Sequence, residues 1–179
     1  MHSQQGENNV KIRQEQKSDH QKVYDINKQA FNQENESKLI EKIRNGENFV
    51  PELSLVAELN GEIVGHILFS KIKIIGDAEY ESLSLAPMAV APKHQKQGIG
   101  GELVKTGLET AKKLGFESVI LVGHSDYYPR FGLKKSSLWG IKCPFEVPDE
   151  AFMAIELVED SLKNKKGYVQ FPKEFMEVE

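Results

Sequence analysis

The stretch LAPMAVAPKHQKQGIGGELV, residues 85–104, contains the features that decide the fold of this 179-residue chain. An apolar run that Pro87 interrupts leads into a polar loop, three glycines within four positions, and a helical pattern. The N-terminus of a helix leaves about four backbone N–H groups without intrahelical partners and carries roughly half a positive charge. Because glycine has no Cβ, an anion can approach those groups closely. The stretch therefore predicts a strand, an anion-binding turn and a helix, in that order.

The glycine turn offers a cluster of backbone donors that suits a diphosphate. A glycine-rich turn that only packs a helix against a sheet is the alternative explanation. Two known phosphate motifs do not fit: no GK[ST] follows the glycines, and Leu103 occupies the third glycine position of the dinucleotide fingerprint. The candidate donors are Gln95, Lys96, Gln97, Gly98, Ile99, Gly100 and Gly101.

Pro87 indicates an irregularity in the strand that precedes the glycine turn. Proline cannot donate to a strand ladder, so it belongs at a sheet edge or a bulge. A bulge within residues 85–90 would part this strand from the apolar strand SVILV, residues 118–122, and would expose unpaired backbone groups. A linear ligand that bears amides can pair there as an extra strand does. A diphosphate at the turn and an amide-bearing arm in the gap together describe coenzyme A.

The pattern along the chain predicts a mixed α/β sheet in one domain, residues 10–179, after a polar, disordered leader at residues 1–9. The run at 118–122 suits a central strand that is buried on both faces and parallel to its neighbour across the helix. The aromatic tail YVQFPKEF is expected to dock on the domain. Helices are predicted at 18–31, 36–46 and 98–114, a hairpin at 53–69 with its turn at Asn60-Gly61, and strands at 10–16, 80–91, 118–122, 138–142 and 151–158.

Composition excludes several classes of protein. The net charge of −4 argues against a general nucleic-acid surface. The single cysteine, Cys143, excludes an intrachain disulfide framework and a cysteine-rich zinc site. No apolar run reaches the roughly 20 residues that span a bilayer, and the N-terminus lacks the apolar region of a signal peptide. We therefore expect a cytoplasmic protein without nucleic-acid or membrane partners and without a metal.

The sequence resembles the GCN5-related N-acetyltransferase (GNAT) superfamily. Residues 95–100 fit the family signature Q/R-x-x-G-x-G/A. With YYPRFG at 127–132 and MAIELVEDSL at 153–162, the chain is similar to the YhbS-like branch of predicted acetyltransferases. The resemblance implies a mixed, mostly antiparallel sheet of about six to seven strands, splayed between strands 4 and 5 and flanked by about four helices.

The resemblance also implies acetyl-CoA as the cosubstrate and assigns its contacts. The pantetheine arm is expected to pair with the backbone of Met88, Ala89 and Val90, and the pyrophosphate to lie on the amides of residues 95–101. Many members carry an asparagine shortly after the fifth strand; this chain has Gly-His-Ser-Asp at 123–126, where Ser125 is the expected contact.

The reaction that the resemblance implies is direct transfer of the acetyl group to a primary amine of a small molecule or peptide. The N–H of Val90 is expected to stabilise the oxyanion. Tyr128, four residues before Gly132, is expected to contact the cofactor and to donate a proton or hydrogen bond to the departing thiolate. Its neighbour Tyr127 is expected to pack in the core. Glu79 or Glu81, His124 and water are the alternatives for proton removal from the amine, with Glu81 and His124 as the candidate side chains at the site.

The alternative function is a non-catalytic acyl-CoA-binding sensor or regulatory module, which has no need of a thiolate acid. A different nucleotide at the glycine turn is a further alternative. The resemblance allows a homodimer. It does not identify the acceptor amine.

Overall fold

The computed structural model describes residues 9–177, so residues 1–8 of the expected leader lie outside the described part. Within it, nine strands join one sheet in the order β1-β2-β3-β4-β5-β8-β6, with β9 pairing with β3 and β7. The single domain of residues 10–179 stays a prediction, although all these strands share one sheet. The strands are β1 (Val10–Gln14), β2 (Phe49–Leu59), β3 (Glu62–Ile75), β4 (Glu79–Val90), β5 (Ser118–Val122), β6 (Lys134–Lys135), β7 (Ile141–Lys142), β8 (Phe152–Glu156) and β9 (Gly167–Gln170).

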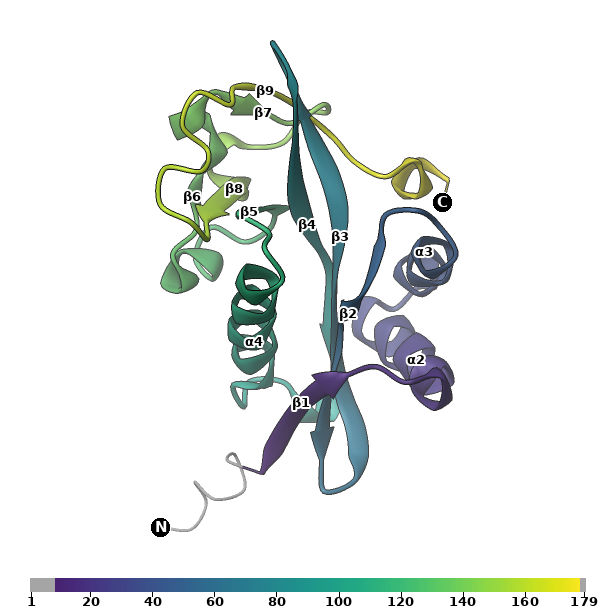
Figure 1. Cartoon of the computed structure of the whole chain (residues 1–179). Helices are drawn as coiled ribbons and strands as arrows, with labels where there is room; N and C mark the ends of the chain where they lie inside the picture. The colour runs from purple at the N-terminus through teal and green to yellow at the C-terminus, as the bar shows by residue number, and fades with distance from the viewer. Residues whose placement is uncertain (1–8, 178–179) are drawn as a thin grey trace.

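Helices cover both faces of the sheet. Figure 1 shows α4 (Ile99–Lys113) on one face, with α2 (His20–Phe31) and α3 (Asn35–Arg44) on the other. None of the helices within residues 9–177 has the length and apolar character that a bilayer crossing requires. Short 3-10 turns complete the chain: η1 (Lys17–Asp19), η2 (Pro92–His94), η3 (Tyr128–Phe131), η4 (Ser136–Trp139), η5 (Asp149–Ala151) and η6 (Lys173–Met176).

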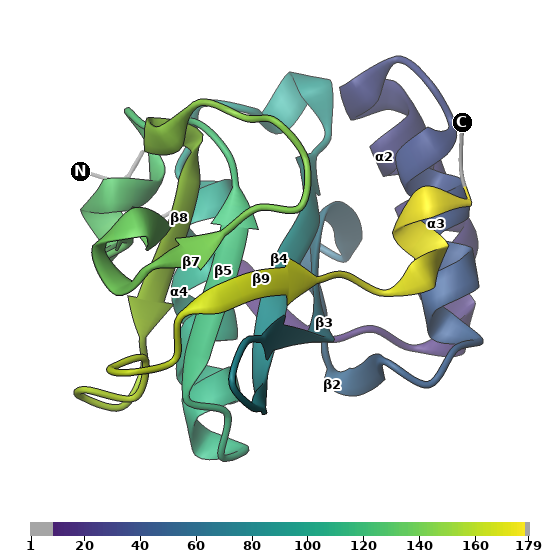
Figure 2. The same ribbon diagram turned by 90° about the horizontal axis from the view of Figure 1, so that it is seen from above.

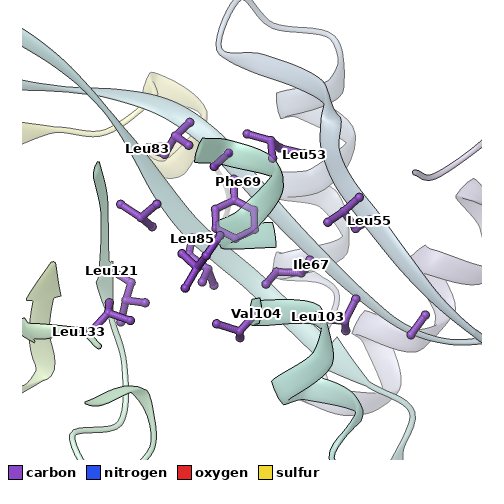
Figure 3. Close-up of a cluster of buried hydrophobic side chains, with 14 of the residues drawn as sticks. Leu53, Leu55, Ile67, Phe69, Leu83, Leu85, Leu103, Val104, Leu121 and Leu133 are labelled. Atoms are coloured by element: carbon purple, nitrogen blue, oxygen red, sulfur yellow. The ribbon is translucent and has the colours of Figure 1, made fainter. Parts of the chain in front are cut away.

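The hairpin of β2 and β3 forms the middle layer of the molecule. Its turn is Asn60-Gly61, whose φ values of 51° and 83° are those of the tight turn that matches strand twist. Leu55 belongs to the cluster that packs on α4, whereas its neighbour Val56 belongs to the cluster under α2 and α3. Figure 3 shows the first cluster, in which Phe69 of β3 lies among the leucines of β2, β4 and α4. The hairpin is therefore buried on both faces.

The sheet confirms the mixed fold that the sequence predicts. β5 pairs with β4 in parallel and with β8 antiparallel. The tail also docks as expected, but as a strand that the sequence did not predict: β9 pairs with β3, and in Figure 2 the chain after it crosses to α3. The strand expected at 138–142 is shorter, because η4 occupies Ser136–Trp139 and only Ile141–Lys142 is extended.

A buried polar network joins α3 to the strands. Glu15, just after β1, accepts hydrogen bonds from Arg44 Nε at 3.0 Å and Nη2 at 2.6 Å, and from Ser54 Oγ at 2.9 Å. Because Ser54 gives its proton to Glu15, it accepts the Nε2–H of His66 at 2.9 Å. His66 is fully buried, and burial lowers its pKa to about 4. His66 is therefore neutral near pH 7 and has a structural role in this network.

Candidate active site

A bulge in β4 opens the sheet where the sequence contains Pro87. Between Met88 and Leu85 the register with β3 shifts, because two residues of β4 lie opposite one of β3. Pro87 lies within this bulge. Among the described residues, the parallel pairing of β4 with β5 is limited to two residue pairs, the last of which joins Ser84 to Ile120. Beyond Ser84 the two strands part, which confirms the expected gap between strands 4 and 5.

The end of β4 turns backbone groups toward this gap. Ala91 donates its N–H to the carbonyl of Val64 on β3, with an N···O distance of 2.8 Å. Successive residues of a strand direct their backbone groups to opposite sides, so the N–H and C=O of Val90 face away from β3. The Val90 carbonyl accepts a hydrogen bond from Gln95 Nε2 at 3.0 Å, which ties the following loop to the strand. The Val90 N–H is thus directed toward the gap.

The glycine turn leaves the N-terminus of α4 open. Gly98 is the N-cap with a φ of 85°, and Lys96 has a φ of 64°, so the chain reverses through two left-handed positions. A Cβ on Gly98 would meet no atom within 4 Å. One on Gly100 would lie 3.2 Å from the Tyr127 hydroxyl and 3.5 Å from the Met88 methyl carbon. Gly98 therefore faces open space at the start of α4, whereas a Cβ on Gly100 would press against Tyr127 and Met88.

That space is part of a cavity of about 760 Å³. Its wall joins the end of β4, the glycine turn, the first turns of α4, and the segment around η3. The residues predicted to bind the cofactor that line it are Met88, Val90, Gln95, Lys96, Gly98, Ile99, Gly100 and Gly101. The other lining residues are His94, Glu102, Lys105, Tyr127, Arg130 and Phe131.

Several predicted site residues lie outside this wall. Ala89 is buried against the cluster under α2 and α3, so its side chain faces away from the cavity. Gln97 is exposed at the turn. His124 and Ser125 are exposed in the loop after β5, where the His124 carbonyl accepts the N–H groups of Tyr127 and Tyr128 at 3.2 and 3.3 Å. The contacts predicted for the Gln97, His124 and Ser125 side chains stay predictions.

Glu81 is not placed in the cleft. It is exposed near the start of β4, where it pairs with Lys73 of β3. At about 3.3 Å per residue, the seven residue steps from Glu81 to Met88 span roughly 23 Å of strand. The role of Glu81 in proton removal stays a prediction, and this separation makes it the less favoured of the alternatives. Because β4 has 12 residues, two side chains on it can lie far apart in the structure.

The tyrosine pair differs from the expectation. Tyr127 lines the cavity, with the Arg130 guanidinium 4.6 Å from its ring centroid. The Tyr128 ring instead covers Gly123, just after β5, so closely that a Cβ there would lie 2.6 Å from a ring carbon. The rings meet edge to face with centroids 5.0 Å apart. Burial raises the pKa of Tyr128 to about 12. Because its ring covers Gly123, Tyr128 adjoins the gap between β4 and β5 from the side of β5.

Two cations that line the cavity, Lys105 and Arg130, are not among the predicted site residues. Lys105 follows Gly101 by four residues, so both share one face of α4. Arg130 follows Tyr127 by three residues within the turn of η3. No local pattern in the sequence predicts that η3 and α4 lie side by side. Their proximity depends on the path of the chain from α4 through β5 to η3.

The comparisons with known proteins point in one direction. The sequence model described as the acetyltransferase (GNAT) family matches residues 20–132. The uncharacterized N-acetyltransferase YjhQ of Escherichia coli (strain K12) is 35% identical over 136 residues, which cover 75% of this chain and 75% of that protein.

Two crystal structures are similar over nearly the whole chain. The GNAT family N-acetyltransferase YhbS from Escherichia coli, in complex with CoA, has a TM-score of 0.88 and 26% identity, with 94% of this chain and 92% of that chain covered. A GNAT family acetyltransferase from Brucella melitensis, in complex with acetyl-CoA, has a TM-score of 0.76 and 28% identity, with 93% and 97% covered. The described fold thus has counterparts in cofactor-bound proteins.

Proposed function

Since this chain belongs to the acetyltransferase (GNAT) family and is an acyltransferase, we propose that it moves an acetyl group from acetyl-CoA directly to a primary amine of a small molecule or peptide. The observation that carries the proposal is the open glycine turn beside the parted strands. It is supported by the two similar structures that contain CoA and acetyl-CoA. A homodimer and a cytoplasmic location stay predictions.

The cofactor would be held by backbone groups. Its diphosphate is expected to accept hydrogen bonds from the N–H groups at the start of α4, which the open space over Gly98 makes accessible. Its amide-bearing arm would lie along Met88 and Val90 as an added strand in the gap. The thioester would then lie near the end of β5, between Val90 and Tyr128.

The acetyl transfer needs two hydrogen-bond donors, one at the carbonyl oxygen of the thioester and one at its sulfur. A neutral amine attacks the carbonyl carbon, the C–N bond forms, and the C–S bond breaks with its electron pair on sulfur. The Val90 N–H faces the gap and is positioned to donate to the carbonyl oxygen, where negative charge develops.

Tyr128 is assigned to the sulfur as a hydrogen-bond donor. Its pKa of about 12 exceeds that of a thiol, about 8.5, by roughly 3.5 units. Full proton transfer to the thiolate would therefore be uphill by about 5 kcal/mol, at about 1.4 kcal/mol per unit. A donated hydrogen bond stabilises the departing sulfur without that cost. The raised pKa also keeps Tyr128 protonated throughout the neutral range.

Proton removal from the amine is assigned to water. Glu81 lies far along β4, and the His124 side chain is exposed in the loop after β5. General base catalysis by a side chain usually contributes about 10²- to 10⁴-fold in rate. A His124→Ala variant should therefore retain kcat within about threefold, and a loss of 10²-fold would reassign the base to His124.

A thiol-release assay tests the function. Purified protein is mixed with acetyl-CoA and a panel of primary amines and amine-terminated peptides, and free CoA thiol is measured together with the acetylated amine by mass. The proposal expects at least one amine to accelerate thiol release with matching product. Tight acetyl-CoA binding without acceleration by any amine would contradict it and would favour the sensor.

A further inference from the structure

A second cavity, of about 640 Å³, lies on the face of the sheet opposite α4. Alternate residues of β5 face opposite sides of the sheet. Val119 and Leu121 belong to the cluster that packs on α4. Ile120 instead belongs to a third cluster, together with Ile141 and Phe152, and these two residues line the second cavity. Figure 2 shows the same arrangement, with β7 and β9 in front of β5 and α4 behind it.

The second cavity reaches the end of β5, where the thioester is expected. Phe152 in its wall pairs with Val122, the last residue of β5. The carbonyl of Ala151 accepts the N–H of Gly123 at 2.9 Å, and Gly123 is the residue that the Tyr128 ring covers. The cofactor would enter the gap from the α4 side, so the amine has to approach the carbonyl carbon from another direction. The second cavity offers an approach from the opposite face.

The wall of the second cavity is mainly apolar and partly aromatic. Its apolar residues are Ile141, Phe145, Val147, Pro148 and Phe152. Phe145 is 51% exposed, so much of its ring is open to a ligand. Small-molecule sites have volumes in this range and walls of this kind. Because two aromatic rings in contact gain more than their buried area alone provides, this wall favours a ligand with an aromatic ring.

Carboxylates outnumber cations in the wall of the second cavity. Glu146 and Asp149 line it, against one ammonium group, that of Lys142. The Lys142 Nζ lies 5.6 Å from the centroid of the Tyr168 ring, and Asp149 forms an ion pair with Lys135 at 3.8 Å. Within residues 9–177, Glu146 has no ion pair. Primary amines have pKa values near 10 and are cations at neutral pH, so a carboxylate at the rim favours their arrival.

We propose that the second cavity is the acceptor pocket and that the acceptor is a small primary amine with an aromatic body. The inference rests on the proposed function, because it takes acetyl transfer to an amine as the reaction. The aromatic body would lie against Phe145 and Phe152. The amino group would extend past Ala151 toward the thioester at the end of β5.

A comparison of amines tests the pocket by kinetics. Thiol release is measured with 2-phenylethylamine and 4-phenylbutylamine, and with n-butylamine, 1,4-diaminobutane and a lysine peptide. Burial of the phenyl ring should give the better aryl amine a kcat/KM at least about 10-fold above that of n-butylamine. Phe145→Ala should raise KM for the aryl amine at least about fivefold and leave KM for acetyl-CoA within about twofold. Val158→Ala, at an exposed apolar position beyond the other end of β8, is the matched control and should behave as wild type.

Trp139 supplies a readout that needs no catalysis. It is the only tryptophan of the chain and packs against the cluster that contains Ile141 and Phe152. A phenyl ring does not absorb at the wavelength that excites tryptophan selectively, so 2-phenylethylamine can be titrated directly. Its binding should change the Trp139 fluorescence saturably, and Phe145→Ala should raise the fitted dissociation constant at least about fivefold. Circular dichroism checks that the variant is folded.

The two readouts separate the possible failures. If an aliphatic amine or the lysine peptide is the better substrate, the inference is overturned, while the measured transfer upholds the proposed function. An unchanged KM and an unchanged fluorescence titration in Phe145→Ala would overturn it in the same way. If no amine accelerates thiol release, the proposed function is contradicted. Saturable binding at Trp139 would then show a ligand pocket that is not an acceptor pocket, which also overturns the inference.

Discussion

Replacing Tyr128 by phenylalanine removes the hydroxyl that is assigned to the departing sulfur and keeps the ring that covers Gly123. A hydrogen bond to a charged partner contributes about 1.5–3 kcal/mol, so its loss in the transition state should lower kcat by roughly 10- to 150-fold. KM for acetyl-CoA should change little, because the sulfur gains charge only as the C–S bond breaks.

The pKa of Tyr128 supplies a second readout. A donor with a pKa of about 12 stays protonated up to about pH 11, so wild-type kcat should not fall between pH 9 and pH 10.5 on account of Tyr128. An unshifted tyrosine, with a pKa near 10, would lose activity in that range.

The assay is steady-state thiol release with the best acceptor from the panel, and Tyr127→Phe is the matched control. Tyr127 lines the cofactor cavity and lies off the gap, so its variant should retain kcat within about threefold. If Tyr128→Phe retains kcat within about twofold while Tyr127→Phe loses more than about 10-fold, the donor is Tyr127 and the reasoning from Gly123 is refuted.

Two further predictions concern the fold. Gly107→Ala should lower the free energy of unfolding by about 1–3 kcal/mol in urea denaturation, because the new Cβ would lie 2.3 Å from a ring carbon of Phe69; an unchanged denaturation midpoint would contradict that packing. His66 has a folded pKa of about 4 and an unfolded pKa near 6.5, so the unfolded chain binds more protons and stability should fall by up to about 3 kcal/mol as pH drops from 6.5 to 4. Between pH 6.5 and 5.5, where carboxylates with an ordinary pKa of about 4 stay mostly ionised, a His66→Asn variant should lose this slope, and a slope equal to that of the wild type would show that another group causes it.

Short local motifs in the sequence predicted the turn, the bulge and the helix start that shape the site. Asn60-Gly61 specifies the hairpin turn, Pro87 marks the bulge, and the glycines after Gln95 begin α4, as the structure confirms. Each of these depends on the backbone preferences of a few adjacent residues. The gap was predicted from Pro87, and the resemblance added the GNAT fold around it.

What the sequence did not predict depends on contacts between distant segments. β9 becomes a strand only because residues 73–75 of β3 offer an edge to it. Which of Tyr127 and Tyr128 faces the cavity is set by the room over Gly123, not by either tyrosine. The distance between Glu81 and the bulge likewise follows from the length of β4, which one strand pattern in the sequence does not give.

The central claim is that the bare N-terminus of α4 binds the diphosphate, and the dissociation constant of Gly100→Leu for acetyl-CoA tests it most directly. The new side chain would enter the space between Tyr127 and Met88, so the variant should bind at least about 100-fold more weakly than wild type. Lys112→Leu, exposed in the same helix, should bind as wild type does, and circular dichroism should show both variants folded. A folded Gly100→Leu variant with an unchanged dissociation constant would contradict the account.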